Sequence, residues 1–100
     1  LLIDQGRAAL AARLLAALHV RPDLARRVSQ VDVTDPRDAV VILEDDTVLL
    51  RLGDDGFVDR LQAYLDLAPT LRERVDGIDY VDLRFDERIY VKPGKVGGRR

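Results

Sequence analysis

The sequence predicts a small α+β domain in which helices cover one face of an antiparallel sheet of about five strands. Three observations lead to this class. Apolar residues recur at helical spacing in two regions, other segments alternate with a period of two, and Pro, Gly and Asp residues separate them. The expected order of elements is α-β-β-β-α-α-β-β, within one domain that comprises residues 1–93.

The first helix is expected at residues 4–18, with Asp4 as its N-cap. Its Ala and Leu residues are strong helix formers, and their three- and four-residue spacing predicts one apolar face. That face comprises Ala8, Ala11, Ala12, Leu15 and Leu18, with Leu14 beside them. The segment Arg21-Pro22-Asp23 breaks the helix, and a short helical turn is expected at residues 24–27.

Three β-rich segments follow: one that begins at Val28 and ends at the turn Asp35-Pro36-Arg37-Asp38, one at residues 39–43 and one at residues 47–52 after the turn Glu44-Asp45-Asp46. Short connections favour antiparallel pairing of successive strands, so a three-stranded meander is expected. In the third segment the side chains alternate between the two faces of the sheet. One face carries Val48, Leu50 and Leu52, and the other carries Arg51.

Gly53 and Gly56 mark the return to helix, and Asp54 or Asp55 is the expected N-cap. The face of this helix that is predicted to meet the sheet carries Phe57, Leu61, Tyr64, Leu65 and Ala68. Pro69 is expected to end the helix. A further short helix is expected at residues 70–75, closed by Gly77.

The last two strands are expected at residues 78–85 and 88–92, as a hairpin with the two-residue loop Asp86-Glu87. Alternation places Val81, Leu83 and Phe85 on one face and Tyr80, Asp82 and Arg84 on the other. On the residues alone, Asp82 and Arg84 form a charge pair on the solvent side that contributes little stability. Residues 94–100 are rich in Gly and basic residues and are expected to form a flexible tail.

The chemistry-bearing residues are expected to serve structure and not catalysis. The chain has no Cys and one His, His19, near a helix end where a positive ring suits the helix dipole. The acidic residues cluster in turns and lack the ligand spacing of an EF-hand. A net charge of -2 gives no electrostatic footprint for nucleic acid. We therefore expect no enzyme activity, no cofactor and no metal site.

The segment Tyr80-Val81-Asp82-Leu83-Arg84-Phe85 resembles the "YVDLRY" strand of the bacterial cell-division family FtsQ/DivIB, with Phe85 in place of the usual Tyr. Other features agree with that family in order and spacing. They are the Leu-Arg-Leu-Gly strand end at residues 50–53, the helix with Leu61, Leu65 and Leu67, the break Pro69-Thr70-Leu71 and the strand at residues 28–33. The resemblance covers residues 10–93.

The resemblance implies the C-terminal β domain of a non-enzymatic scaffold that supports septum formation. It implies a periplasmic or other extracytoplasmic position, and an inner-membrane anchor in a segment that this sequence does not contain. It also implies that FtsB, in complex with FtsL, adds a β segment to the last strand of the sheet. The contact residues expected on that basis are Arg84, Phe85, Arg88, Ile89, Tyr90, Val91 and Lys92, with Tyr90 as the aromatic anchor. One departure is the turn, where Glu87-Arg88 replaces the family's usual Gly.

Two alternatives stay open at the level of the sequence. The same edge strand could pair with a second copy of the chain and form a symmetric dimer. The acidic loops could serve a calcium- or metal-assisted hydrolase.

Overall fold

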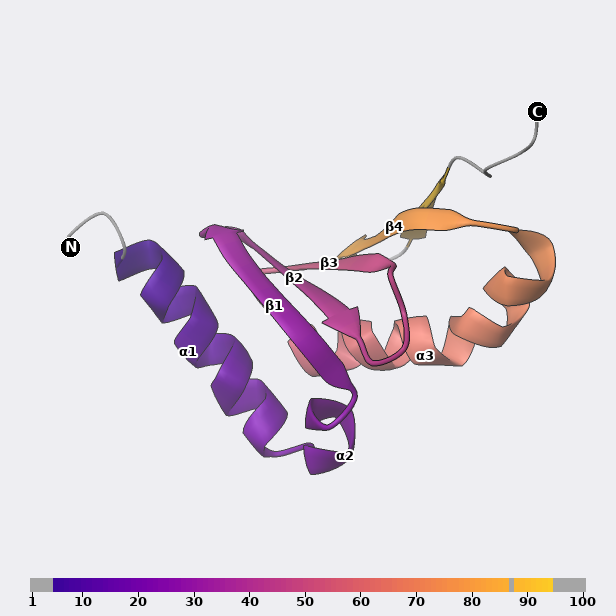
Figure 1. Cartoon of the computed structure of the whole chain (residues 1–100). Coiled ribbons are helices and arrows are strands. Elements are labelled where there is room, and N and C mark those ends of the chain that lie inside the picture. The colour runs from indigo at the N-terminus through magenta and orange to yellow at the C-terminus, as the bar shows by residue number, and fades with distance from the viewer. Residues whose placement is uncertain (1–4, 87, 95–100) are drawn as a thin grey trace.

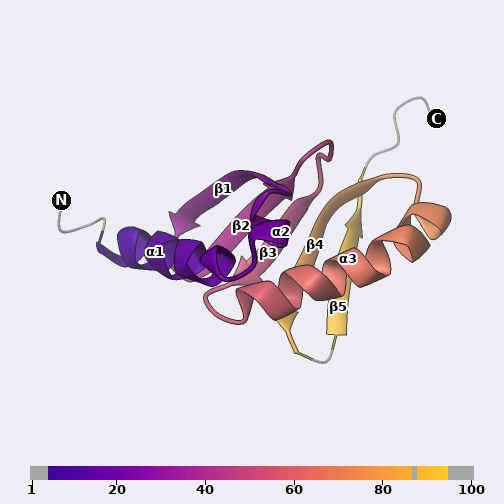
Figure 2. The same cartoon turned by 90° about the horizontal axis from the view of Figure 1, so that it is seen from below.

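The computed structural model describes residues 5–86 and 88–94 and confirms the expected fold class. The elements in chain order are α1 (Gln5–His19), α2 (Pro22–Ala25), β1 (Val28–Asp35), β2 (Asp38–Leu43), β3 (Leu49–Gly53), α3 (Phe57–Arg74), β4 (Ile78–Phe85) and β5 (Arg88–Pro93). The strands form one sheet of five in the order β1-β2-β3-β4-β5. Helices α1 and α3 lie on the same side of this sheet (Figure 1 and Figure 2). We call the opposite side the open face.

Three expectations fall on residues outside this description. They are the N-cap at Asp4, the hairpin residue Glu87 and all of the predicted tail except Gly94.

Helix α1 forms where it is expected, but the predicted apolar face is wrong in part. The buried side chains are Leu10, Leu14 and Leu18, whereas Leu15 is 63% exposed. The reason is that α1 is apolar nearly all round, so spacing alone does not select the buried face. Three Leu side chains at four-residue spacing remove more apolar area from water than a face made mostly of Ala, and they take the core position.

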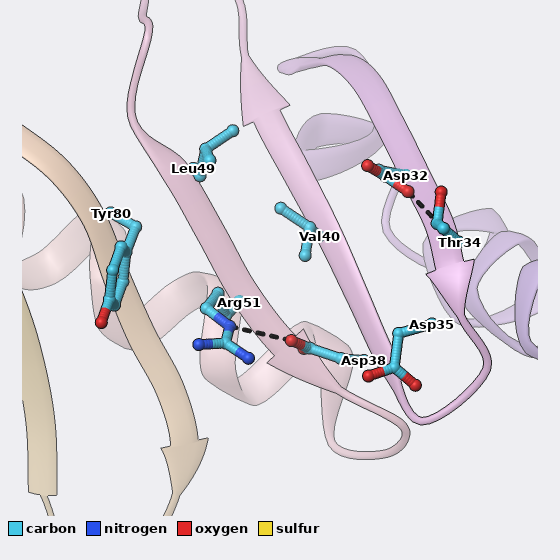
Figure 3. A pocket seen from close by; sticks show the side chains of 8 residues that line it. All are labelled: Asp32, Thr34, Asp35, Asp38, Val40, Leu49, Arg51 and Tyr80. Carbon is cyan, nitrogen blue, oxygen red and sulfur yellow. Dashed lines mark hydrogen bonds and ion pairs between the residues drawn. The ribbon is translucent and has the colours of Figure 1, made fainter.

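The meander of β1, β2 and β3 is confirmed, because both of its strand pairs are antiparallel. Its inner face supplies Ala39, Val41 and Leu50 to the core beneath the helices, where each is at most 1% exposed. Arg51 lies on the opposite face, as expected, and it lines a pocket there together with Val40 (Figure 3).

The expected all-antiparallel sheet is wrong at one pair, because β3 and β4 run parallel, with Leu50 opposite Val81. Parallel neighbours cannot be joined by a tight turn and need a crossover, which is usually helical. Helix α3 is that crossover, and it packs on the two strands that it connects. The sheet is therefore mixed, with antiparallel pairs at β1·β2, β2·β3 and β4·β5.

The two helices expected on either side of Pro69 are one helix, α3, with Pro69 inside it. Pro69 is exposed, and the apolar stripe of the helix continues past it from Ala68 to Leu71. Burial of that stripe offsets the backbone hydrogen bond that a proline removes. The ends also differ from expectation. Gly56, at φ 59°, takes the N-cap position in place of Asp54 or Asp55, and Val75 is the C-cap in place of Gly77.

Candidate functional site

The sheet has two edge strands, β1 and β5, and they differ in regularity. In the β1·β2 hairpin, register shifts between Val28 and Gln30 and between Asp32 and Asp35 place an extra residue on β1 each time. In the β4·β5 hairpin the corresponding extra residues lie on β4, the inner strand. The two hairpins have the same register, because each residue pair in β1·β2 matches a pair in β4·β5 whose residue numbers are both 50 higher. The same bulges therefore distort one edge strand and leave β5 regular.

A carboxylate holds the second bulge in each hairpin. The backbone N–H of Thr34 donates to Oδ1 of Asp32 at 2.8 Å, and the backbone N–H of Arg84 donates to Oδ1 of Asp82 at 3.1 Å. Bulges and charged side chains on an edge strand hinder its pairing with another strand. Strand β1 carries both devices itself, whereas β5 has the charged side chains of Arg88 and Lys92 but no bulge within residues 88–93.

The direction of the backbone groups along β5 follows from its end. The N–H of Gly94 donates to the carbonyl oxygen of Gly77 at 3.0 Å, toward β4. Because these directions alternate along an antiparallel strand, Lys92 and Tyr90 also direct their backbone groups toward β4. Ile89 and Val91 direct theirs outward, to the free edge. Pro93 ends this outward row, since proline has no N–H to offer.

The side chains of β5 divide between the two faces as the sequence predicts. Ile89 and Val91 are half-buried and pack against the core on the helix side. Arg88, Tyr90 and Lys92 are exposed, and their partners in the register include Asp82 and Tyr80 on the open face. The free edge thus has an apolar side anchored in the domain and a cationic and aromatic side open to solvent.

Phe85 is expected on the same face as Val81 and Leu83, and this expectation is wrong. It is 47% exposed and lies opposite Arg88 in the register. The bulge after Asp82 is the cause, because one extra residue reverses the alternation of side chains beyond it. Phe85 thereby reaches the open face beside Tyr90.

Four of the predicted contact residues meet in one cluster, which we call the platform: Arg84, Phe85, Arg88 and Tyr90. The rings of Phe85 and Tyr90 meet edge to face, with centroids 5.5 Å apart. The guanidinium of Arg84 lies 5.6 Å from the centroid of the Phe85 ring, and Nη1 of Arg88 donates to the Tyr90 hydroxyl at 3.0 Å. Together with Asp86 they line a shallow pocket at the end of the hairpin. Aromatic and Arg side chains of this kind dominate binding energies at protein interfaces.

The pair of Asp82 and Arg84 exists on the open face, as expected, but Asp82 is buried there and not exposed to solvent. It is 5% exposed, and it accepts hydrogen bonds from Nε and Nη2 of Arg84 at 2.9 Å and 2.7 Å. These bonds lower the pKa of Asp82 below its ordinary value of 3.8, and they raise the pKa of Arg84. The reason for the burial is that Arg84 and Arg51 extend over the sheet and cover the carboxylate.

A second buried carboxylate, Asp38, lies beside this pair. It accepts a hydrogen bond from Nε of Arg51 at 2.9 Å and another from the backbone N–H of Gly53 at 3.0 Å. The guanidinium of Arg51 also lies 5.6 Å from the centroid of the Tyr80 ring. Figure 3 shows Asp38, Arg51 and Tyr80 side by side on β2, β3 and β4. Together these charges join three strands across the open face.

The remaining candidates from the sequence stay apart from the platform. His19 lies in the last turn of α1, and this helix packs on the side of the sheet opposite the open face. Within residues 5–86 and 88–94, no group of three or more His, Cys, Asp or Glu side chains is placed to hold a metal ion. Within the same residues, no helix has the length and apolar character needed to cross a membrane.

Alternation in the sequence does not reveal the bulges after Asp32 and Asp82, nor the role of Asp38. A signal for the bulges is present, because Val31-Asp32-Val33 and Val81-Asp82-Leu83 repeat one pattern of apolar residues around an Asp. The repeat shows that an Asp at this position of a hairpin has a shared structural task. Asp38 follows a turn and gives no comparable signal, since its hydrogen-bond donors come from β3, a different strand.

The fold and the site define a small α+β domain with one regular free edge and a cationic, aromatic platform beside it. Comparison with known proteins gives the family. Residues 2–84 match the family described as "Cell division protein FtsQ/DivIB, C-terminal". The chain therefore belongs to this family, as the resemblance indicates, and it is a domain of a cell-division protein and not of an enzyme family.

A curated relative agrees with this assignment. It is the cell division protein FtsQ of Koribacter versatilis (strain Ellin345), which is 37% identical over 71 residues. The alignment covers 69% of this chain and 20% of the relative. The family match ends at residue 84, within β4, so β5 lies beyond it.

Proposed function

We propose that this domain is a scaffold of the bacterial division machinery that binds the FtsB/FtsL complex by strand addition to β5. An extended segment of FtsB pairs with the outward backbone groups of Ile89 and Val91. The whole protein is held at the inner membrane by a segment outside this sequence, and this domain lies on the extracytoplasmic side. The domain has no catalytic role in this account.

The observation that carries the proposal is the contrast between the two edges of the sheet. Strand addition needs a straight row of unpaired N–H and C=O groups, which a partner strand can complete. Of the two edge strands, β1 has two bulges and exposed acidic side chains, whereas β5 has neither of the bulges in its hairpin. The platform lies beside this open edge and gives side-chain contacts to whatever strand pairs there.

Charge favours a different chain as the partner over a second copy. In a symmetric antiparallel pair of β5 strands centred on Tyr90, Arg88 would face Lys92 of the copy. Like charges in directly opposed positions destabilise a strand pair. A partner strand with acidic side chains would instead be attracted to both residues, which are exposed on the open face.

The test changes one outward N–H and leaves the hairpin intact. Ile89→Pro removes a donor from the free edge without removing a hydrogen bond to β4, so the domain is expected to stay folded and to lose FtsB/FtsL binding. Ile89→Ala is the matched control, because it shortens the same side chain but keeps the N–H. Binding is measured by calorimetry with the purified FtsB/FtsL complex, and folding by circular dichroism.

The side chains of β5 are expected to contribute to the binding free energy in addition to the backbone hydrogen bonds. Tyr90→Ala is expected to weaken binding by about 2 kcal/mol or more, as for a buried aromatic anchor. The proposal is wrong if the folded Ile89→Pro variant binds the complex as tightly as the unchanged domain.

A further inference from the structure

The shape of the platform depends on the bulge in β4. Phe85 reaches the open face only because the extra residue after Asp82 reverses the alternation of side chains. In a regular strand Phe85 would turn toward the helices, and its ring would lose the edge-to-face contact with Tyr90. Whatever holds this bulge therefore determines where the aromatic surface lies.

Asp82 holds both the β4 bulge and the side chain of Arg84. Its carboxylate accepts the backbone N–H of Arg84, which fixes the bulge, and the guanidinium of the same residue, which fixes the side chain. The side chain so held lies over the Phe85 ring. Bidentate pairing of this kind defines the plane of the guanidinium as well as its position.

The line of contacts then continues to the edge strand. The Phe85 ring meets the Tyr90 ring, and the Tyr90 hydroxyl accepts a hydrogen bond from Arg88. Asp82 itself is 5% exposed, so its carboxylate is covered by Arg84 and cannot be a main contact for a partner. Asp82 can therefore influence a partner strand only by the positions in which it holds Arg84 and Phe85.

Comparison with Asp38 shows that a carboxylate can be buried and paired with Arg without holding the platform in place. It is 4% exposed, and it also accepts hydrogen bonds from one Arg side chain and one backbone N–H. The donors are Arg51 and Gly53, which belong to β3 and not to the platform. Its contact with the platform residue Arg84 is an ion pair at 4.0 Å without a hydrogen bond. Asp38 and Asp82 are therefore two similar carboxylates, of which one stabilises the middle of the sheet and the other shapes its edge.

We propose that Asp82 is a positioning residue for the β5 docking surface: through Arg84 and the β4 bulge it holds Phe85 and Tyr90 in the arrangement that a partner strand meets. The proposal rests on the proposed function for the identity of the partner. The part that concerns the platform itself can be tested without any partner.

The first experiment follows the platform in the isolated domain by nuclear magnetic resonance. In Asp82→Asn the cross-peaks between the Phe85 and Tyr90 rings are expected to disappear, and the Arg84 amide is expected to exchange faster with solvent. In Asp38→Asn, the matched control, both signals are expected to stay. Thermal unfolding of the two variants shows whether they remain folded at the temperature of the measurement.

The second experiment is a double-mutant cycle on binding of the FtsB/FtsL complex. Asp82→Asn is expected to weaken binding about tenfold, and to have a smaller effect in an Arg84→Ala background, where the guanidinium is already gone and only the hydrogen bond to the backbone N–H of residue 84 is left to change. Asp38→Asn is expected to leave the affinity within about twofold, because its hydrogen bonds come from Arg51 and Gly53, whereas Nη1 of Arg84 lies 4.0 Å from its carboxylate.

The outcomes separate the two proposals. If the unchanged domain does not bind the complex, the proposed function fails, while the ring contact still decides the role of Asp82. If Asp82→Asn keeps the ring contact, the positioning role is wrong. It is also wrong if Asp82→Asn and Arg84→Ala weaken binding additively, or if Asp38→Asn weakens it as much as Asp82→Asn does.

Discussion

At the scale of single residues, the carboxylate of Asp82 is kept charged by its neighbours. Hydrogen bonds from Arg84 are the main cause of its lowered pKa, and Arg51 on β3 adds a favourable charge at 3.9 Å. Asp38 on β2 faces the same two guanidinium groups and competes for them. A group with a lowered folded-state pKa stabilises the fold above its unfolded pKa, and this contribution is lost as the pH falls through the folded pKa.

The first prediction is a pH dependence of stability that belongs to Asp82. The unfolding free energy of the unchanged domain is expected to fall between about pH 5 and pH 3, and less steeply in Asp82→Asn, which has no proton to bind there. Urea denaturation at a series of pH values measures the unfolding free energy of the unchanged domain and of the variant. Equal slopes for the two proteins would show that Asp82 does not stabilise the fold through its charge.

The second residue-scale prediction concerns the buried face of α1. Leu14 is 1% exposed and Leu15 is 63% exposed, although the two are neighbours in an apolar sequence. Leu14→Ala is expected to destabilise the domain by about 2–5 kcal/mol, because it leaves a cavity in the core. Leu15→Ala is expected to change stability by less than about 0.5 kcal/mol, as surface substitutions usually do. Chemical denaturation of both variants checks the pair, and a reversed order would contradict the observed orientation of α1.

At the scale of elements, β5 pairs with β4 on one side, and no strand within residues 5–86 and 88–94 pairs with its other side. Its backbone groups alternate between β4 and the outside, as the hydrogen bond from Gly94 to Gly77 indicates. In the free domain the amides of Ile89 and Val91 are expected to exchange with solvent faster than those of Tyr90 and Lys92. Residue-resolved hydrogen exchange measures this directly. Uniform protection along β5 would mean that the free edge is covered.

The sequence predicted the elements where local pattern decides and missed those where distant contacts decide. The bounds of β4 match residue for residue, because alternation and turn signals mark both of its ends. The continuity of α3 through Pro69 and the parallel pairing of β3 with β4 could not be predicted in this way. Both depend on how the apolar stripe of α3 packs on strands that lie on either side of it in the sequence.

In the candidate site, too, the features that local pattern decides are predictable and those that distant contacts decide are not. The last strand, its edge position and the two faces of its side chains are predictable from alternation and from its place at the end of the chain. The exposure of Phe85 and the burial of Asp82 are not, because both result from a bulge and from guanidinium groups that reach across the sheet. A single bulge therefore separates the expected placement of Phe85 from the observed one.

At the scale of the whole molecule, two hairpins with the same register flank β3. Each has its bulges on the first strand. In one hairpin that strand is the outer edge, and in the other it is the inner neighbour of the edge. The same local device thus distorts the β1 edge of the sheet and leaves the β5 edge regular, so β5 is the edge better suited to pairing with another strand.

The most direct measurement of strand addition is hydrogen exchange at β5 with the FtsB/FtsL complex bound. The account predicts that the amides of Ile89 and Val91 become protected on binding, while the exchange of the β1 amides stays unchanged. Protection confined to β1 or to the helices, with Ile89 and Val91 still exchanging as in the free domain, would contradict it.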